Sequence, residues 1–212
     1  MMKLVRGNNN ASWSLRAWLA LRRAGLPFEE HIIQLGEPDT QARIAAHSPS
    51  GLVPILFDGD VRVWDSLAIC EYANDLRPAA RLWPADLGAR AAARSVSAEM
   101  HAGFEALRRT LPVQFALEFP VVADLTTFPA DVKADIARLL AIWRECRARY
   151  GAAGPYLFGH FTIADAMFAP VASRFRTYNI PLGGAEAEYA RTLWAMPEMA
   201  EWMEGARREW DD

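Results

Sequence analysis

Hydrophobic and polar positions alternate along the first third of the chain and are interrupted by stretches with a helical period. The pattern predicts four strands and three helices in the order β-α-β-α-β-β-α. The strands fall at Lys3–Arg6, at Phe28–Leu35 and on either side of a turn at Asp58-Gly59. The helices begin near Ser12, Asp39 and Ser66. A mixed sheet of this size needs helices on both faces, so this part of the chain is predicted to be α/β.

The strand-like alternation ends near residue 78, and everything after a proline-containing stretch has helical spacing. The expected helices are Leu87 to about Leu117, Ala130–Tyr150, Thr162–Tyr178, Glu186–Trp194 and Pro197–Arg208. The sequence therefore predicts an α/β domain at residues 1–78, a linker at 79–86 and an all-helical domain at 87–212.

Composition narrows the class of protein without naming a function. The 212 residues are 52% hydrophobic and carry a formal net charge of -3, and the arginine pairs are scattered, which does not favour a nucleic-acid partner. No apolar run reaches the roughly 20 residues of a membrane helix, and the N-terminus lacks the apolar region of a signal peptide. Cys70 and Cys146 have no metal-binding spacing. We therefore expect a cytoplasmic protein without a metal or a membrane partner.

Val53-Pro54 is an unusual pair at the entrance of the third strand. Proline has no N–H to give to a strand ladder, so an ordinary trans proline at a sheet edge is one interpretation. A cis bond is the other interpretation, and it would turn the Val53 N–H and C=O outward to pair with an extended peptide.

Asp65-Ser66 stands where the third helix begins. Ser66 has the chemistry of a helix cap. Alternatively, the Ser66 hydroxyl, the exposed N–H groups and the helix dipole would receive the α-carboxylate of a ligand, and Asp65 would bind its α-ammonium.

Thr162 and Asp165 have the spacing of a capping box, with aspartate in place of the usual glutamate. The pair predicts the start of a helix rather than a catalytic acid.

Taken together, these segments resemble the soluble glutathione transferase superfamily, and specifically its bacterial and zeta-class members. The stretch "GLVPILFDGDVRVWDSLAICEY" resembles the Val-Pro, hairpin and Ser-x-Ala-Ile segment of that family, and "FTIADAMFAPV" resembles its C-terminal capping box and buried helix. The resemblance covers essentially the whole chain. It implies a thioredoxin-like N-terminal domain, a helical C-terminal domain and a homodimer.

The resemblance also implies how glutathione, γ-Glu-Cys-Gly, would be held. Leu52, Val53 and Pro54 would bind the cysteinyl unit, with Pro54 in the cis form. Asp65 and Ser66 would hold the γ-glutamyl ammonium and carboxylate.

The residue that activates the thiol is expected in the loop "GNNNASWSLRAW". A free thiol has a pKa near 8.5, so a donor is needed to favour the thiolate at neutral pH. The relatives carry serine or cysteine just before this Ser-Trp, whereas Ala11 stands here. Ser12 is the first candidate, Asn10 the second and Asn9 the third, and the alternative for Ser12 is a helix cap.

A second substrate would lie between the domains, against one helical stripe. His101, Phe104, Glu105 and Arg108 share such a stripe if the helix is continuous. The alternative interpretation gives these residues no role in substrate binding: Phe104 would lie in the core, and Arg108 would be a surface charge. An apolar wall would be added by Trp13, Phe115 and Phe119. An apolar pocket with one or two positively charged side chains would suit a flat electrophile that carries a carboxylate.

Three functions fit this sequence. The first is a transferase whose bound thiolate attacks a small hydrophobic electrophile, with glutathione as co-substrate. A variant is a glutathione-dependent cis–trans isomerase of the maleylacetoacetate type. Ala11 favours a third function, a non-catalytic glutathione-binding module.

Overall fold

Four strands form one mixed sheet in the order β2-β1-β3-β4. The computed structural model describes the backbone of residues 1–211 and the side chains of residues 1–209. Strand β1 pairs in parallel with β2 and antiparallel with β3, and β3 pairs antiparallel with β4. The bounds are β1 Met2–Gly7, β2 Phe28–Ile33, β3 Ile55–Asp58 and β4 Val61–Trp64. The predicted thioredoxin-like order of strands and helices is confirmed.

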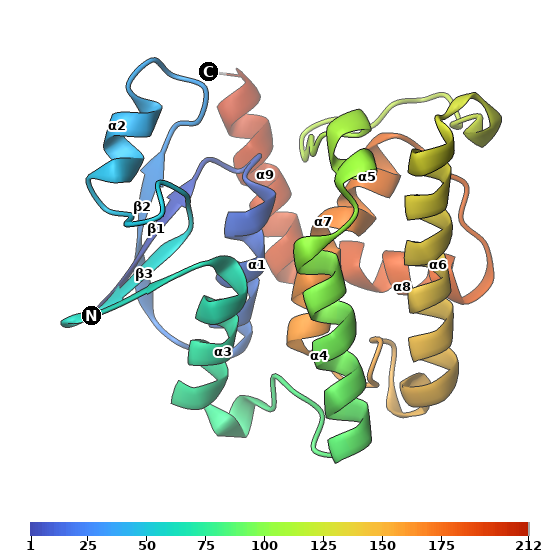
Figure 1. The fold of residues 1–212 in the computed structure, drawn as a ribbon, viewed down its shortest axis with the longest axis horizontal. Helices are drawn as coiled ribbons and strands as arrows, with labels where there is room; N and C mark the ends of the chain where they lie inside the picture. The colour runs from blue at the N-terminus through green and yellow to red at the C-terminus, as the bar shows by residue number, and fades with distance from the viewer. Residues whose placement is uncertain (212) are drawn as a thin grey trace.

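The two faces of the sheet are covered by different helices because side chains alternate along each strand. The helices are α1 Ser12–Arg23, α2 Thr40–Ala45 and α3 Ser66–Leu76. Val5 and Ile55 pack with Ile44 of α2, whereas Leu4 and Leu56 belong to the large core that contains the buried faces of α1 and α3. Figure 1 shows α1 and α3 side by side along the centre of the molecule.

The hairpin turn lies one residue later than predicted. Asp58 still pairs with Val61, so the two-residue loop is Gly59-Asp60 rather than Asp58-Gly59. Gly59 has a φ of 57°, a conformation that glycine adopts at no steric cost.

The second half of the chain is helical, as predicted, with short 3-10 turns at Pro78–Ala80, Leu125–Thr127 and Gly151–Ala153. Helices α4 to α8 stand together beside the sheet domain, and α9 returns to lie against α1 (Figure 1). The bounds are α4 Leu87–Ala102, α5 Glu105–Thr110, α6 Ala130–Tyr150, α7 Ile163–Thr177, α8 Gly184–Trp194 and α9 Pro197–Asp211.

The prediction of one long helix from Leu87 to about Leu117 is wrong. Helix α4 ends at Ala102, and a separate short helix, α5, begins at Glu105. Between them Phe104 has a φ of 62°, in the left-handed region that a continuous right-handed helix cannot contain. The predicted stripe therefore does not exist as one helical face; its members were His101, Phe104, Glu105 and Arg108.

Helix α7 is the central element of the helical domain and is buried along nearly its whole length. Its capping box is confirmed, because Asp165 Oδ2 accepts hydrogen bonds from the N–H and the hydroxyl of Thr162 (2.7 and 3.0 Å). Leu157 N–H and the Tyr189 hydroxyl donate to Asp165 Oδ1 (3.2 and 3.0 Å). Burial raises the pKa of Asp165 to about 6, and these donors oppose that rise.

Over residues 1–211, none of the helices combines the length and the apolarity that crossing a membrane requires.

Candidate glutathione site between the two domains

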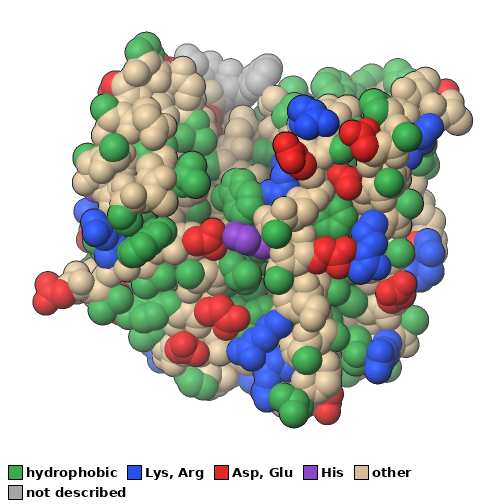
Figure 2. Space-filling model, in the orientation of Figure 1, with side chains coloured by type: hydrophobic (Ala, Val, Ile, Leu, Met, Phe, Trp, Pro, Cys, Tyr) green, Lys and Arg blue, Asp and Glu red, His purple; other side chains and the backbone are tan. Residues whose placement is uncertain are grey.

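A pocket of about 530 Å³ opens where the first residues of α1, the loop before β3, the start of α3 and the end of α4 meet. This volume lies within the range of small-molecule sites. Figure 2 shows a histidine beside an acidic side chain in the hollow between the two halves of the molecule. The lining residues are Trp13, Ser50, Leu52, Val53, Pro54, Trp64, Asp65, Ser66 and His101.

The loop before β3 presents the Val53-Pro54 bond to this pocket. The bond is cis, as the resemblance implied, so the trans interpretation is wrong. Ser48 stabilises this loop. Its hydroxyl accepts a hydrogen bond from Leu52 N–H (3.2 Å) and forms another with the Ser50 hydroxyl (3.0 Å). The Leu52 side chain is 68% exposed at the rim.

Asp65, not Ser66, caps α3. Its Oδ1 accepts from Leu67 N–H (2.8 Å), so the prediction that Ser66 is the cap is wrong. Asp65 has a φ of 78°, and positive φ at a non-glycine residue is strained backbone of the kind found at functional sites. Ser66 is the first helical residue, and its buried Oγ has no hydrogen-bond partner among the described side chains and backbone. An unsatisfied hydroxyl beside the N-terminus of a helix is suited to an anion.

Asp65 also connects the two domains. His101 Nε2 of α4 lies 3.2 Å from Asp65 Oδ2. Burial lowers the pKa of His101, and Asp65 opposes this effect. His101 of α4 packs edge-on against Trp13 of α1 with ring centroids 5.0 Å apart, so one residue from each domain contributes to this side of the pocket.

The three thiol candidates have different surroundings. Asn9 and Asn10 lie in the loop before α1, and Ser12 is the first residue of α1, next to Trp13, which lines the pocket. None of the three candidates is itself a lining residue. Ala11 occupies the N-cap position, so Ser12 is not the cap of α1, and its side chain is largely buried. Asn10 Oδ1 accepts from Phe115 N–H (3.1 Å), which leaves its amide Nδ2 as the group able to donate.

Asn9 is a structural link between the sheet domain and α9. Its Nδ2 donates to the Trp202 carbonyl (2.7 Å), and its own carbonyl accepts from Trp202 Nε1 (2.7 Å). Its Oδ1 accepts from Arg6 Nη1 (3.2 Å), so the side chain is fully engaged. Asn9 is therefore the weakest of the three thiol candidates.

We expect Asn9→Ala to lower the free energy of unfolding by about 1–3 kcal/mol, because the Trp202 carbonyl loses its buried donor. Denaturant unfolding measures the change. Asn8→Ala is the matched control, since Asn8 Oδ1 has no partner among the described residues. Equal stability of the two variants would contradict the structural assignment of Asn9.

The predicted electrophile residues are only partly brought together. Trp13 and His101 line the pocket, whereas Phe104 is buried in the core. Arg108 donates to the carbonyls of Met100 and His101, the latter at 3.3 Å, and its Cζ lies 4.6 Å from the Trp13 ring centroid. Arg108 therefore contacts the pocket through Trp13 rather than directly.

The other residues suggested for this wall also lie elsewhere. Phe115 is buried against Trp202, and Phe119 packs on Tyr178. Glu105 of the predicted stripe is exposed on α5.

The protein's own thiols are not suited to nucleophilic chemistry. Cys70 and Cys146 are free and buried. Burial raises the pKa of Cys146 to about 12 and raises that of Cys70 as well. Because the thiolate is the nucleophile, a reactive sulfur in this pocket must come from a ligand.

The domain pattern matches two family models, which together cover most of the chain. Residues 11–76 match the glutathione S-transferase N-terminal domain, and residues 89–208 match the glutathione S-transferase C-terminal domain. The chain belongs to the glutathione S-transferase superfamily.

The chain is also similar to two curated relatives and to one solved structure. A probable maleylacetoacetate isomerase of Vibrio cholerae is 34% identical over 110 residues, 48% of this chain and 51% of that protein. The maleylacetoacetate isomerase of Rattus norvegicus is 26% identical over 178 residues, 82% of this chain and 77% of the rat protein. The chain thus spans about half the length of the Vibrio relative. A glutathione transferase homologue from Burkholderia GL BGR1 with bound glutathione has the same fold, with a TM-score of 0.72 and 22% identity over 98% of both chains.

Ser50 and Trp64 also line the interdomain pocket, and the sequence pattern did not predict them as site residues. Trp64 directly precedes Asp65, and Ser50 lies two residues before Leu52, so proximity to predicted site residues is the signal that could have found them. Among the described side chains, no group of three or more His, Cys, Asp or Glu is placed to hold a metal ion.

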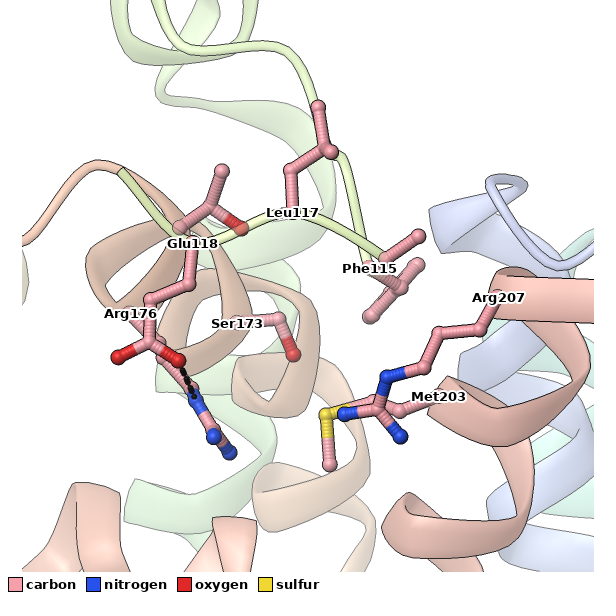
Figure 3. A pocket seen from close by; sticks show the side chains of 9 residues that line it. Phe115, Leu117, Glu118, Ser173, Arg176, Met203 and Arg207 are labelled. Carbon is pink, nitrogen blue, oxygen red and sulfur yellow. Dashed lines mark hydrogen bonds and ion pairs between the residues drawn. The ribbon is translucent and has the colours of Figure 1, made fainter. Parts of the chain in front are cut away.

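A second pocket lies on another part of the surface, between the loop at Phe115–Glu118 and helices α7 and α9. Figure 3 shows Arg176 bound to Glu118 on one side and Met203 and Arg207 on the other. Its volume is only about 30 Å³, room for a water molecule rather than for a tripeptide.

Proposed function

We propose that the protein is a glutathione transferase whose interdomain pocket binds glutathione and directs its thiolate at a small hydrophobic electrophile. One observation carries the proposal: Asp65, the unpartnered Ser66 hydroxyl and the cis Val53-Pro54 segment line a single pocket. The Burkholderia homologue, which has bound glutathione, supports the choice of ligand.

Each end of the ligand has a chemical partner in this proposal. The γ-glutamyl carboxylate takes the Ser66 hydroxyl and the N-terminus of α3, where exposed N–H groups and the helix dipole favour an anion. The γ-glutamyl ammonium pairs with the Asp65 carboxylate, which also contacts His101. The backbone of Val53 pairs with the cysteinyl unit, as an added strand does, with Leu52 and Pro54 beside it.

Ser12 is the proposed hydroxyl donor to the thiolate, ahead of Asn10. We expect Ser12→Ala to lower kcat/KM for conjugation about 100-fold, the lower end of the effect of removing one preorganised donor. Asn10→Ala is the matched comparison, because the Asn10 carbonyl oxygen already serves Phe115. A larger loss in Asn10→Ala than in Ser12→Ala would reverse the assignment.

The test of the function is conjugation of glutathione to chlorodinitrobenzene, followed by absorbance, with a maleyl diketo acid as a second substrate. Turnover of the aromatic electrophile is the expected result. The Vibrio and rat relatives favour the isomerase as the second candidate, and turnover of the diketo acid alone would select it. Ala11 favours the binding module, and glutathione binding without turnover of either substrate would select that function.

A homodimer and a cytoplasmic location belong to the same proposal and rest on the resemblance to the superfamily. Sedimentation of the purified chain measures the dimer.

A further inference from the structure

Arg16, in the middle of α1, is a completely buried arginine (0% exposed). Its Nε and Nη1 have no hydrogen-bond partner among the residues that the structure describes. Burial, with repulsion from Arg108 and Arg174, lowers its pKa to about 9, so the guanidinium remains charged at neutral pH. A buried cation without a paired anion costs stability.

The charged groups around Arg16 are mostly cations. Arg108 of α5 and Arg174 of α7 repel it, and Asp65 at the start of α3 attracts it. Cys70 of α3 and His101 of α4 are the other titratable groups within range. Arg174 Nε donates to the Leu111 carbonyl (2.9 Å), and Arg108 Nη2 donates to carbonyls at the end of α4, so each of these guanidinium groups has at least one acceptor, although Arg108 Nε has none among the described residues.

Trp13 separates this charge from the pocket. The Cζ of Arg16 lies 4.3 Å from the Trp13 ring centroid, and that of Arg108 lies 4.6 Å from it. Trp13 in turn lines the pocket with Asp65, Ser66 and His101. The positive charge is therefore one aromatic ring away from the ligand, in surroundings of low dielectric where charges act strongly.

We propose that Arg16 is a positioning residue that stabilises the thiolate of bound glutathione from behind Trp13. This inference rests on the proposed function and adds a second source of thiolate stabilisation beside the proposed Ser12 hydroxyl. Ala11 has no donor, and the Asn10 side chain is partly used by Phe115. A buried guanidinium supplies positive potential without touching the sulfur.

Arg16→Met removes the charge and keeps the volume. The readout is the ultraviolet thiolate absorbance of bound glutathione, titrated against pH. In the wild type we expect a thiol pKa below that of the free tripeptide, and in the variant a rise of about one unit, a tenfold loss of thiolate. Affinity for S-methylglutathione, whose sulfur cannot ionise, should stay unchanged. The melting temperature should not fall, because an unpaired buried charge is replaced by an apolar side chain.

Arg22→Met is the matched control on the same helix, since Arg22 is at the surface and pairs with Glu201. Arg16→Lys should keep most of the thiolate, because a positive charge remains. An unshifted thiol pKa in the wild type, or a wild-type value in Arg16→Met, overturns the proposal. Failure of Arg16→Met to fold also overturns it, because Arg16 would then be required for the fold. Absence of glutathione binding in the wild type is a separate outcome, which defeats the proposed function itself.

Discussion

Ser66→Ala is expected to weaken glutathione binding about 10- to 100-fold without lowering the melting temperature. A hydrogen bond to a charged group contributes about 1.5–3 kcal/mol, and the γ-glutamyl carboxylate would lose one. The free protein should lose nothing, because Ser66 Oγ is buried without a partner among the described residues. Calorimetric titration gives the affinity, and thermal unfolding gives the stability.

Ser95→Ala is the matched control for this variant. Ser95 lies on α4 with its hydroxyl bonded to the Ala91 carbonyl, and it does not line the pocket. Its glutathione affinity should equal that of the wild type. A Ser66→Ala protein that binds as tightly as the control, or that melts at a lower temperature, would show that Ser66 serves the fold and not the ligand.

Asp165→Ala is expected to cause the largest loss of stability, about 3–5 kcal/mol, because the change breaks a buried hydrogen-bond network. Four donors converge on this carboxylate: the N–H groups of Thr162 and Leu157 and the hydroxyls of Thr162 and Tyr189. Without it, the capping box of α7 loses its carboxylate, and the N–H groups of Thr162 and Leu157 lose their acceptor. Thermal unfolding should show a drop of roughly 10 °C for a chain of this size.

Tyr189→Phe provides the graded comparison, since it removes one of the four donors and leaves the capping box intact. Its cost should be about 1 kcal/mol. Equal losses in the two variants would mean that the capping box adds nothing beyond the contact with Tyr189.

Local motifs made the glutathione side of the pocket predictable. Val53-Pro54 and Asp65-Ser66 lie within a segment of fourteen residues. The hairpin and helix of this same segment bring them together, so no distant contact is needed to form this side of the pocket. The sequence could not predict which of Asp65 and Ser66 caps α3 and which keeps its side chain available for a ligand. Both residue types cap helices, and the backbone of Asp65, with its positive φ, decides which side chain reaches Leu67 N–H.

The helical side of the pocket depends on contacts that a sequence pattern does not carry. The spacing around His101 and Phe104 is compatible with one long helix, and the break at Gly103 follows from the left-handed conformation of Phe104, a residue that rarely adopts it. Asn9 is fixed by Trp202 almost two hundred positions away. The burial of Arg16 likewise arises only when α1 packs against α7 and the C-terminal half of the chain.

Calorimetric titration of the wild-type protein with glutathione should show saturable binding with one site per chain, competed by S-methylglutathione and weakened in Ser66→Ala. A folded wild-type protein that releases no heat and shows no saturation at millimolar glutathione would contradict this expectation. The pocket between the domains would then belong to another ligand.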